Sequence, residues 1–280
     1  MNRVGTSFTS VAMVSIGCAA SANVTFIDHD FLAANWTDGF ASVDGNGGSY
    51  TAGQQGGVGN PGDYYDVFHM LADAPAMENS GIAVFHDCTF MVYDPSIDGA
   101  IAWVDVAVDL RKFSTFSTQV RVAAYQNGAL YVNSNAITGS SITNNWGTQT
   151  RLIEGAESWS LVLPELELDS SSHPDFSASG SPISFGFYTA NSTGVGFGGY
   201  NSTVGVDNFR VTVIPACPGD VTGAGGTPDG MVDVDDLNAI LSAWGTTVGI
   251  GSPLDLANDD GVIDVDDLNA ILSNWGHDCR

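Results

Sequence analysis

The sequence predicts a mainly β protein, in which an antiparallel β-sandwich is followed by a small helical domain. Short segments of alternating apolar and polar residues run from residue 23 to about 214, separated by turns rich in glycine and serine. After Pro215 the pattern changes to two nearly identical copies of a short helical segment. A chain of 280 residues, 44% of them hydrophobic, is long enough for one large core and one small core.

The first 22 residues predict a secretory signal peptide. Arg3 supplies a positive charge, residues 11–20 are mostly small and apolar, and residues 20–22 read Ala-Ser-Ala, as a cleavage site requires. A lipoprotein signal at Cys18 is the weaker alternative, because Ser15 stands where a large aliphatic residue is typical. No stretch is apolar for long enough to span a membrane. We expect a secreted protein, extracellular or attached to the cell surface.

An excess of acid is the main feature of the composition. The chain has 32 acidic residues and 7 Lys and Arg, a formal net charge of −25. Such a chain repels nucleic acids and acidic membrane surfaces but attracts divalent cations. Twelve of the acids lie between Cys217 and Arg280. We therefore expect no nucleic-acid partner, and we expect cations to bind in the C-terminal segment.

Strand patterns fill the region from residue 23 to 214. Apolar residues alternate with polar ones at 104–109 and 208–213, and Asn127-Gly128 predicts a tight turn between strands at 120–125 and 129–132. Further strands are expected at 24–31, 82–93, 158–163, 183–188 and 195–200. Many short strands without helical periodicity are typical of an antiparallel sandwich.

The two ends of this region resemble a known class of sandwich. Residues 26–31, Phe-Ile-Asp-His-Asp-Phe, and residues 206–209, Val-Asp-Asn-Phe, are similar to the first and last strands of jelly-roll domains of the concanavalin-like and carbohydrate-binding type. The resemblance implies a jelly-roll fold and a polysaccharide as a possible ligand. Asp28, Asp30 and Asp207 are candidates for a structural calcium where these strands meet, with solvent-facing acids as the favoured alternative.

The C-terminal segment contains a sharp duplication. Residues 232–245 and 263–276 are identical at 12 of 14 positions and are offset by 31 residues. Each copy places aspartates before Leu-Asn-Ala-Ile-Leu-Ser-x-Trp, whose apolar spacing predicts one face of a short helix. A loop followed by a helix is half of an EF-hand.

The aspartates fit the calcium loop of an EF-hand, which takes ligands from positions 1, 3, 5, 7, 9 and 12 and has glycine at position 6. Gly230 and Gly261 occupy position 6. Counting back from position 12, the later ligands are Asp236, Asp233, the Met231 carbonyl and Asp229, and in the second loop Asp267, Asp264, the Val262 carbonyl, Asp260 and Asn258. Asp220 and Thr222 open the first loop before an insertion, and Asp255 serves as position 1 if one residue bulges. The alternative is a solvated acidic face.

These loops are similar to those of type I dockerins. The resemblance is carried by Gly-Asp-Val-Thr at 219–222, by Asp-Gly at each turn and by Asp at position 12, and it covers residues 217–280. It implies two calcium ions and a cohesin-like or other surface or scaffold protein as partner. The implied contact positions are Val234, Asp235, Leu241 and Ser242, with Val265, Asp266, Leu272 and Ser273 in the second repeat.

Three cysteines remain after removal of the signal. Cys217 and Cys279 bracket the C-terminal segment, which predicts a disulfide in an oxidising compartment. Cys88 follows His86 and Asp87. On a strand, His86 and Cys88 share a face that Asp87 does not, so we expect a buried inert thiol rather than a catalyst.

Weak catalytic candidates are Glu165, Glu167 and Asp169, which would line one face of a strand. Paired carboxylates are the groups that glycoside hydrolases use, although laminarinase-like jelly rolls order these residue types differently. The alternative is a solvent face, with Leu166 and Leu168 inward. The G-x-G-x-x-G pattern at 57–62 contains proline and predicts a loop rather than a nucleotide site.

Four tryptophans could stack on sugar rings or fill the core: Trp36, Trp103, Trp146 and Trp159. The sequence therefore predicts a signal peptide at 1–22, a jelly-roll sandwich at 23–214 and a dockerin-like calcium module at 217–280. The leading hypothesis is a non-catalytic attachment protein. The alternatives are a glycan-active enzyme or a carbohydrate-binding module that carries a dockerin, and a module that only stabilises the C-terminus.

Overall fold

The structure, a computed structural model, describes residues 23–44, 48–74, 79–137, 144–223, 229–249, 252–258 and 260–278, without side chains at 40–44. The signal peptide predicted at 1–22 lies outside the described residues. Among the described residues no helix has the length and apolarity that a bilayer span requires.

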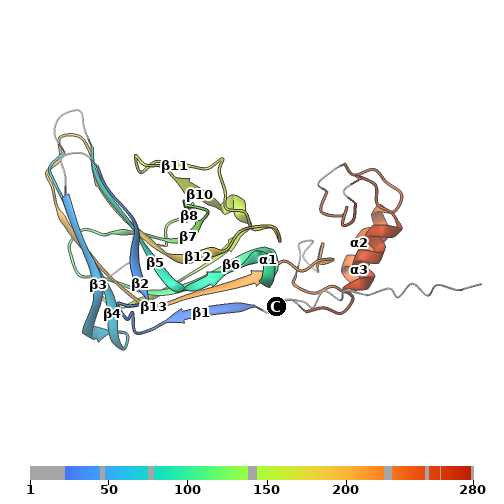
Figure 1. The fold of residues 1–280 in the computed structure, drawn as a ribbon, viewed down its shortest axis with the longest axis horizontal. Helices are drawn as coiled ribbons and strands as arrows, with labels where there is room; N and C mark the ends of the chain where they lie inside the picture. The colour runs from blue at the N-terminus through green and yellow to red at the C-terminus, as the bar shows by residue number, and fades with distance from the viewer. Residues whose placement is uncertain are drawn as a thin grey trace, which may run out of the picture.

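The described chain is mainly β and forms two antiparallel sheets, as the sequence predicts (Figure 1). The first sheet has the order β3 (Gly48–Gly59), β4 (Gly62–Leu71), β13 (Asn201–Pro215), β6 (Ile101–Lys112), β9 (Gly147–Glu154), and β1 (Val24–Asp28) also pairs with β13. The second has the order β11 (Leu168–Asp169), β10 (Trp159–Val162), β8 (Ala129–Asn133), β7 (Gln119–Gln126), β12 (Ile183–Thr193), β5 (Ser80–Tyr93), β2 (Trp36–Asp44). A helical turn, α1 (Pro95–Asp98), and a 3₁₀ turn, η1 (Ala156–Ser158), lie between strands.

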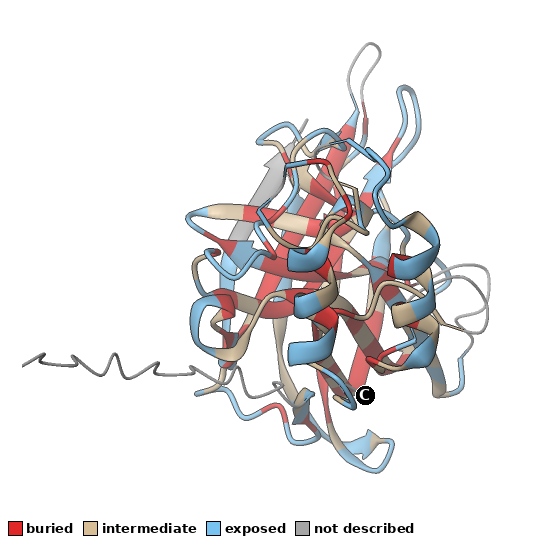
Figure 2. Ribbon diagram, turned by 90° about the vertical axis from the view of Figure 1, so that its right-hand side faces the viewer, coloured by how far each residue is buried: buried red, intermediate tan, exposed pale blue. Residues whose placement is uncertain are grey.

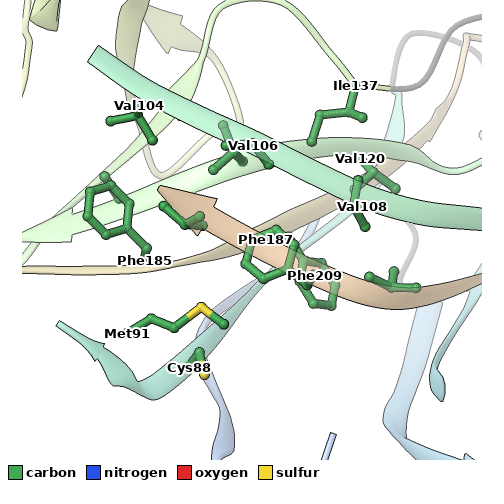
Figure 3. Close-up of a cluster of buried hydrophobic side chains, with 14 of the residues drawn as sticks. Cys88, Met91, Val104, Val106, Val108, Val120, Ile137, Phe185, Phe187 and Phe209 are labelled. Carbon is green, nitrogen blue, oxygen red and sulfur yellow. The ribbon is translucent and has the colours of Figure 1, made fainter. Parts of the chain in front are cut away.

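The main core fills the space between the sheets. Alternate residues of β6 and β13 are buried there and meet Phe185 and Phe187 of β12, as Figure 3 shows. Cys88 and Met91 of β5 line the same core. Burial raises the pKa of the Cys88 thiol to about 12, so the thiol stays protonated and unreactive at neutral pH.

A second apolar cluster covers the outer face of the seven-stranded sheet. Leu166 packs against buried residues of that face, including Ala83, Ala123 and Tyr188. The expectation that Glu165, Glu167 and Asp169 line one face of a strand is wrong, because the chain forms a turn at this point. Leu166 has a φ of 64°, its N–H donates to the Leu163 carbonyl at 3.0 Å, and only Leu168 and Asp169 return as a strand.

The strand expected at 195–200 is also wrong. The Phe197 N–H donates to the Gly194 carbonyl at 3.1 Å and Gly196 has a φ of 79°, so this segment is a turn between β12 and β13. The glycine pattern at 57–62 falls on the hairpin between β3 and β4 and opens no helix. In both places glycine supplies backbone angles that other residues rarely adopt.

Two short helices, α2 (Val234–Ala243) and α3 (Val265–Ser273), follow the sandwich (Figure 1). They pack on a cluster of four fully buried residues: Val232, Ile240, Ile263 and Ile271. Each loop bonds to the chain beyond the other helix. Val232 exchanges backbone hydrogen bonds with Gly276 and His277, and Ile263 does so with Gly245 and Thr246, at 2.8–3.1 Å. The duplication in sequence is therefore a reciprocal arrangement in space.

Candidate functional site

Hydrogen bonds fix the register of the first acidic loop. Asp220 accepts the N–H groups of Asp229 at 3.1 Å and Gly230 at 2.7 Å through its two carboxylate oxygens. Asp236 accepts from Val221 and Thr222 through one oxygen and from Asp233 through the other, at 2.7–2.9 Å. The first and last aspartates of the loop thus bind its backbone from opposite ends.

The second loop repeats these bonds at equivalent positions. Asp255 Oδ2 accepts the Gly261 N–H at 2.7 Å, as Asp220 does with Gly230, and Asp267 Oδ1 accepts from Leu256 and Ala257 at 2.7 and 3.1 Å. Asp255, and not Leu256, is therefore the residue of the second loop that corresponds to Asp220. Counted from Asp255 to Asp267, this loop has one residue more than the twelve of an EF-hand loop. Asn258, with a left-handed φ of 66°, accommodates the extra residue. Sequence counting alone left this point open.

The last two aspartates of each loop also cap the helix that follows. Asp233 and Asp264 are the N-cap residues of α2 and α3, and Asp236 and Asp267 complete capping boxes with them. Burial favours the neutral form of Asp267, but backbone N–H donors outweigh it and lower its pKa. Burial raises the pKa of Asp220, with Asp236 and Asp229 adding repulsion. A cation beside Asp220 would reverse that shift.

The donor set of the loops fits calcium. Asp255 Oδ1 is buried and accepts no hydrogen bond in the described part of the chain, and an ionised carboxylate has about four acceptor positions, so the other bonded oxygens keep free lone pairs. The exposed side chains of Asp229 and Asp260 accept hydrogen bonds from the N–H groups of Met231 and Val262. The carbonyls of Met231 and Val262 therefore follow directly after each turn. The described His, Cys, Asp and Glu side chains do not converge in a group of three that would hold a metal alone. Backbone carbonyls, Thr222 and water would supply the remaining oxygens.

Both helices expose the same apolar residues. Val234, Leu241 and Trp244 are 55%, 50% and 45% exposed. Their counterparts, Val265, Leu272 and Trp275, are 54%, 50% and 48% exposed, and pale blue marks exposed stretches on both helices in Figure 2. The partner positions implied by the dockerin resemblance include four of these six residues. The two tryptophans were missed, although their repetition after each helix was a usable signal.

An open groove of about 370 Å³ lies on the outer face of the seven-stranded sheet. Strands β7 and β12 form its floor, and the turn before β11 forms a wall. Its lining includes Gln119, Arg121, Leu166, Leu168, Tyr188 and Tyr200. No Asp or Glu is among the lining residues. The sequence did not reveal this groove, because strand order, not chain order, brings its residues together.

The Tyr200 ring in the lining of the groove is held firmly. The Tyr200 hydroxyl donates to the Ser192 carbonyl at 3.0 Å, and its ring lies 4.4 Å from the ring of Phe116, which is 50% exposed. Arg121 is fixed by bonds from Nη1 to the Asn133 and Ser134 carbonyls at 2.7 and 2.5 Å. Fixed aromatic and polar groups on an open surface suit a ligand with apolar faces and many hydroxyls.

The weak catalytic candidates do not form a pair at this groove. Glu165 and Glu167 are exposed in the turn. Asp169 accepts hydrogen bonds from the Ser171 hydroxyl and N–H and from the Ser172 hydroxyl, which lower its pKa. A carboxyl group held in its charged form by three donors is a poor general acid.

The four tryptophans have different environments. Trp36 and Trp159 are buried, and the Trp36 indole donates to Asp28 at 2.7 Å. Trp103 is half-buried. Trp146 is half-buried too, and its indole donates to the Val58 carbonyl at 2.7 Å. The groove thus uses tyrosines rather than these tryptophans.

Buried histidines form a hydrogen-bonded chain through the sandwich. His86 contacts Asp38 at 3.2 Å and Thr189 at 3.0 Å, and Thr189 contacts His69 at 3.3 Å. His69 also contacts Asn191 at 2.9 Å. The order Asp, His, Thr resembles a nucleophile with its base, but Thr189 has no exposed surface, so a substrate cannot reach its hydroxyl. These hydrogen bonds serve to satisfy the polar groups that are buried in the core.

The candidates for a structural calcium in the sandwich are used in protein contacts. Asp28 accepts from the Asp30 and Phe31 N–H groups and from Trp36. Asp207 is fully buried and accepts the N–H groups of Asn60 and Asn208. The predicted third ion stays a prediction. So does the Cys217–Cys279 disulfide, because Cys279 lies outside the described residues.

No protein-family model matches the chain, and no curated protein does. Among solved structures, the chain is similar to a family 11 carbohydrate-binding module from Clostridium thermocellum in complex with a β-1,3-1,4-mixed-linked tetrasaccharide, at 16% identity and a TM-score of 0.40, covering 70% of this chain and 97% of that one. It is also similar to the CBM22-1 xylan-binding domain of Paenibacillus barcinonensis Xyn10C, at 11% identity and a TM-score of 0.35, covering 71% and 99%.

Proposed function

We propose that this is a non-catalytic binding protein that acts outside the cell and is attached to a surface or scaffold protein by a calcium-dependent C-terminal module. The observation that supports attachment most is the pairing of two equivalent loop–helix units, each with the same capped helix and the same exposed apolar residues. Apolar side chains that stay half-exposed at matching positions of two copies are typical of a contact surface.

Calcium would be held by the loop residues already described. In the first loop these are Asp220, Thr222, Asp229, the Met231 carbonyl, Asp233 and Asp236; in the second they are Asp255, Asn258, Asp260, the Val262 carbonyl, Asp264 and Asp267. The ion would supply charge that allows clustered carboxylates to lie close together. Calcium at a hundred times its dissociation constant would add about 2.7 kcal/mol of stability per site.

Calorimetric titration of the full chain with calcium tests this part. Two bound ions are expected. The variant Asp236→Asn with Asp267→Asn should lose tight binding. The control, Glu154→Gln with Glu157→Gln, removes the same number of negative charges, but from exposed positions outside the loops, and should keep it. Equal titrations of the two variants would contradict the proposed sites.

Docking should be possible through either helix, because the two surfaces are nearly identical. Replacing Val234 and Leu241 with serine should weaken capture of a purified cohesin domain or surface receptor only slightly. Replacing Val265 and Leu272 in the same chain should abolish it. A complete loss with the first pair alone would rule out two-way docking, and binding that survives all four changes would rule out this surface.

The sandwich is proposed to bind a polysaccharide in the groove. The groove supports this because it is open along a sheet face, carries the ring of Tyr200, against which Phe116 packs, and has hydrogen-bonding side chains at Gln119 and Arg121. Its lining contains no carboxylate pair, which favours a binding module over a hydrolase.

Affinity electrophoresis through gels that contain polysaccharides tests the groove. Retardation by at least one polysaccharide is expected, and Tyr200→Ala should remove it. Phe90→Ala is the matched control, since Phe90 is an exposed aromatic residue that does not line the groove. A retarded Tyr200→Ala variant would contradict the site, and release of reducing sugar by the intact protein would favour the enzyme.

A further inference from the structure

Each helix of the C-terminal module is followed by an exposed tryptophan. Trp244 comes directly after α2, and Trp275 lies two residues beyond the end of α3. Both side chains are about half-exposed, and neither belongs to the apolar core of the module. Tryptophan is among the residues that contribute most to contacts between proteins. Both residues are therefore candidates for contact with the partner of this module.

A left-handed glycine follows each tryptophan and reverses the chain. Gly245 and Gly276 have φ values of 72° and 78°, which residues with a side chain rarely adopt. Beyond each glycine the chain runs beside the acidic loop of the other repeat. There it forms an isolated β-bridge, Thr247 with Val262 and Asp278 with Met231.

The backbone next to each tryptophan is bonded to the middle of the other repeat's loop. Gly245 donates its N–H to the Ile263 carbonyl at 2.8 Å, and Gly276 donates its N–H to the Val232 carbonyl at 2.9 Å. Val232 and Ile263 are fully buried, so these contacts cannot slide along the chain without exposing the core of the module.

These two buried residues lie between proposed calcium ligands. Val232 stands between the Met231 carbonyl and Asp233, and Ile263 has the equivalent place in the second loop. A residue whose two neighbours bind the same ion has a fixed backbone. A filled loop therefore fixes the segment to which the tryptophan of the other repeat is attached.

The start of each helix depends on its own loop instead. Asp233 and Asp236 form the capping box of α2, with Val234 in the first turn, and the equivalent residues do the same for α3. One exposed surface thus begins at Val234, which the first loop holds, and ends at Trp244, which the second loop holds.

Charge limits what can cover these surfaces. Between residues 217 and 278 the chain has twelve acidic residues and no Lys or Arg. Two calcium ions would offset only four of these negative charges. A second copy of the module is therefore repelled, whereas a protein with Lys or Arg around an apolar area is attracted.

We propose that each docking surface needs both calcium ions, because the loop of its own repeat fixes the start of the helix and the loop of the other repeat fixes the tryptophan at its end. The partner is a surface or scaffold protein whose contact area is apolar and surrounded by Lys or Arg. This inference rests on the proposed calcium-dependent docking. A module that holds one ion docks through neither helix.

Fluorine NMR of the full chain labelled with fluorotryptophan follows each ring during a calcium titration, and Trp244→Phe and Trp275→Phe assign the two signals. Asp229→Asn and Asp260→Asn are a matched pair, because each removes one charged ligand and the asparagine oxygen still accepts the N–H two residues on. Asp229→Asn should raise the calcium midpoint of the Trp275 signal at least tenfold and that of Trp244 less than twofold. Asp260→Asn should do the reverse.

An amphipathic helical peptide of leucine and lysine, titrated at physiological salt, is the probe for the docking surface. The same peptide with glutamate in place of lysine should bind at least tenfold more weakly. Trp244→Ser with Trp275→Ser should weaken binding of the lysine peptide at least tenfold, whereas Phe90→Ser, at an exposed position of the sandwich, should change it less than twofold. Asp229→Asn and Asp260→Asn should each raise the calcium that this binding requires.

Four results would overturn the inference. Tryptophan signals that follow the loop of their own repeat, or that shift equally in both variants, would refute the crosswise attachment. Peptide binding supported by one filled loop, or binding that survives loss of both tryptophans, would refute the two-ion docking surface. A calcium-dependent dimer on gel filtration would make a second copy the occupant. A chain that binds no calcium in calorimetry would refute the proposed function as well, whereas two bound ions with any of the other results would leave it standing.

Discussion

The buried histidines predict that the sandwich loses stability in mild acid. Burial, together with the neighbouring His86, lowers the pKa of His69 to about 4. An exposed histidine in the unfolded chain has a pKa near 6.5. The unfolded chain therefore binds a proton over a pH range in which the folded chain does not, and stability decreases as pH falls from about 6.5 to about 4.

The size of this effect follows from the pKa difference. One pKa unit corresponds to about 1.36 kcal/mol, so a difference of about 2.5 units costs the fold about 3 kcal/mol at pH 4 relative to pH 7. Burial lowers the pKa of His86 as well, against the opposing effect of Asp38, so His86 adds to the loss.

Urea denaturation between pH 7 and pH 4, followed by near-ultraviolet circular dichroism, measures the loss. His69→Gln should lower stability at pH 7 but flatten the dependence on pH, because the variant has one fewer site to protonate. His29→Gln is the control, since that histidine is exposed and its ring hydrogen-bonds to Asn208 at 2.6 Å. The same pH dependence in His69→Gln and in the unaltered protein would refute the reasoning.

Three other predictions concern separate parts of the chain. Gly205→Ala should lower the free energy of unfolding by about 1–3 kcal/mol, because the new methyl group collides with the Phe113 ring, and thermal unfolding would show it. Asp255→Asn should weaken one of two calcium sites in calorimetry and leave the other unchanged, and two weakened sites would contradict the assigned register. Peptide mapping without reduction should recover Cys217 linked to Cys279, and two free thiols would disprove that bond.

The fold was predictable only in part, because β2, β3, β4 and β9 were not among the expected strands. Alternation at Val104, Val106 and Val108 predicted β6, and Asn127-Gly128 predicted the turn from β7 to β8, because both signals are local. The turn at Leu166 was missed because a leucine with a left-handed backbone conformation is uncommon. Here it is held by packing against buried residues of β5, β7 and β12, which are distant in the sequence.

The candidate site was predictable only in part, for a related reason. Asp220, Asp236 and their second-repeat equivalents lie within one short loop each, so spacing along the chain located them. Arg121 and Tyr188 come from strands β7 and β12, which pair with each other although 56 residues of chain, 127–182, lie between them. Neighbours in a sheet cannot be read from a single sequence when strand order departs from chain order.

The exchange of backbone bonds between the two C-terminal loops bears on how this module arose. Val232 bonds to the segment after α3, and Ile263 bonds to the segment after α2. A chain with a single repeat would leave these N–H and carbonyl groups without protein partners, and a second copy of the same repeat offers the matching groups. The duplication thus has the form of an ancestral homodimer whose two subunits became one polypeptide.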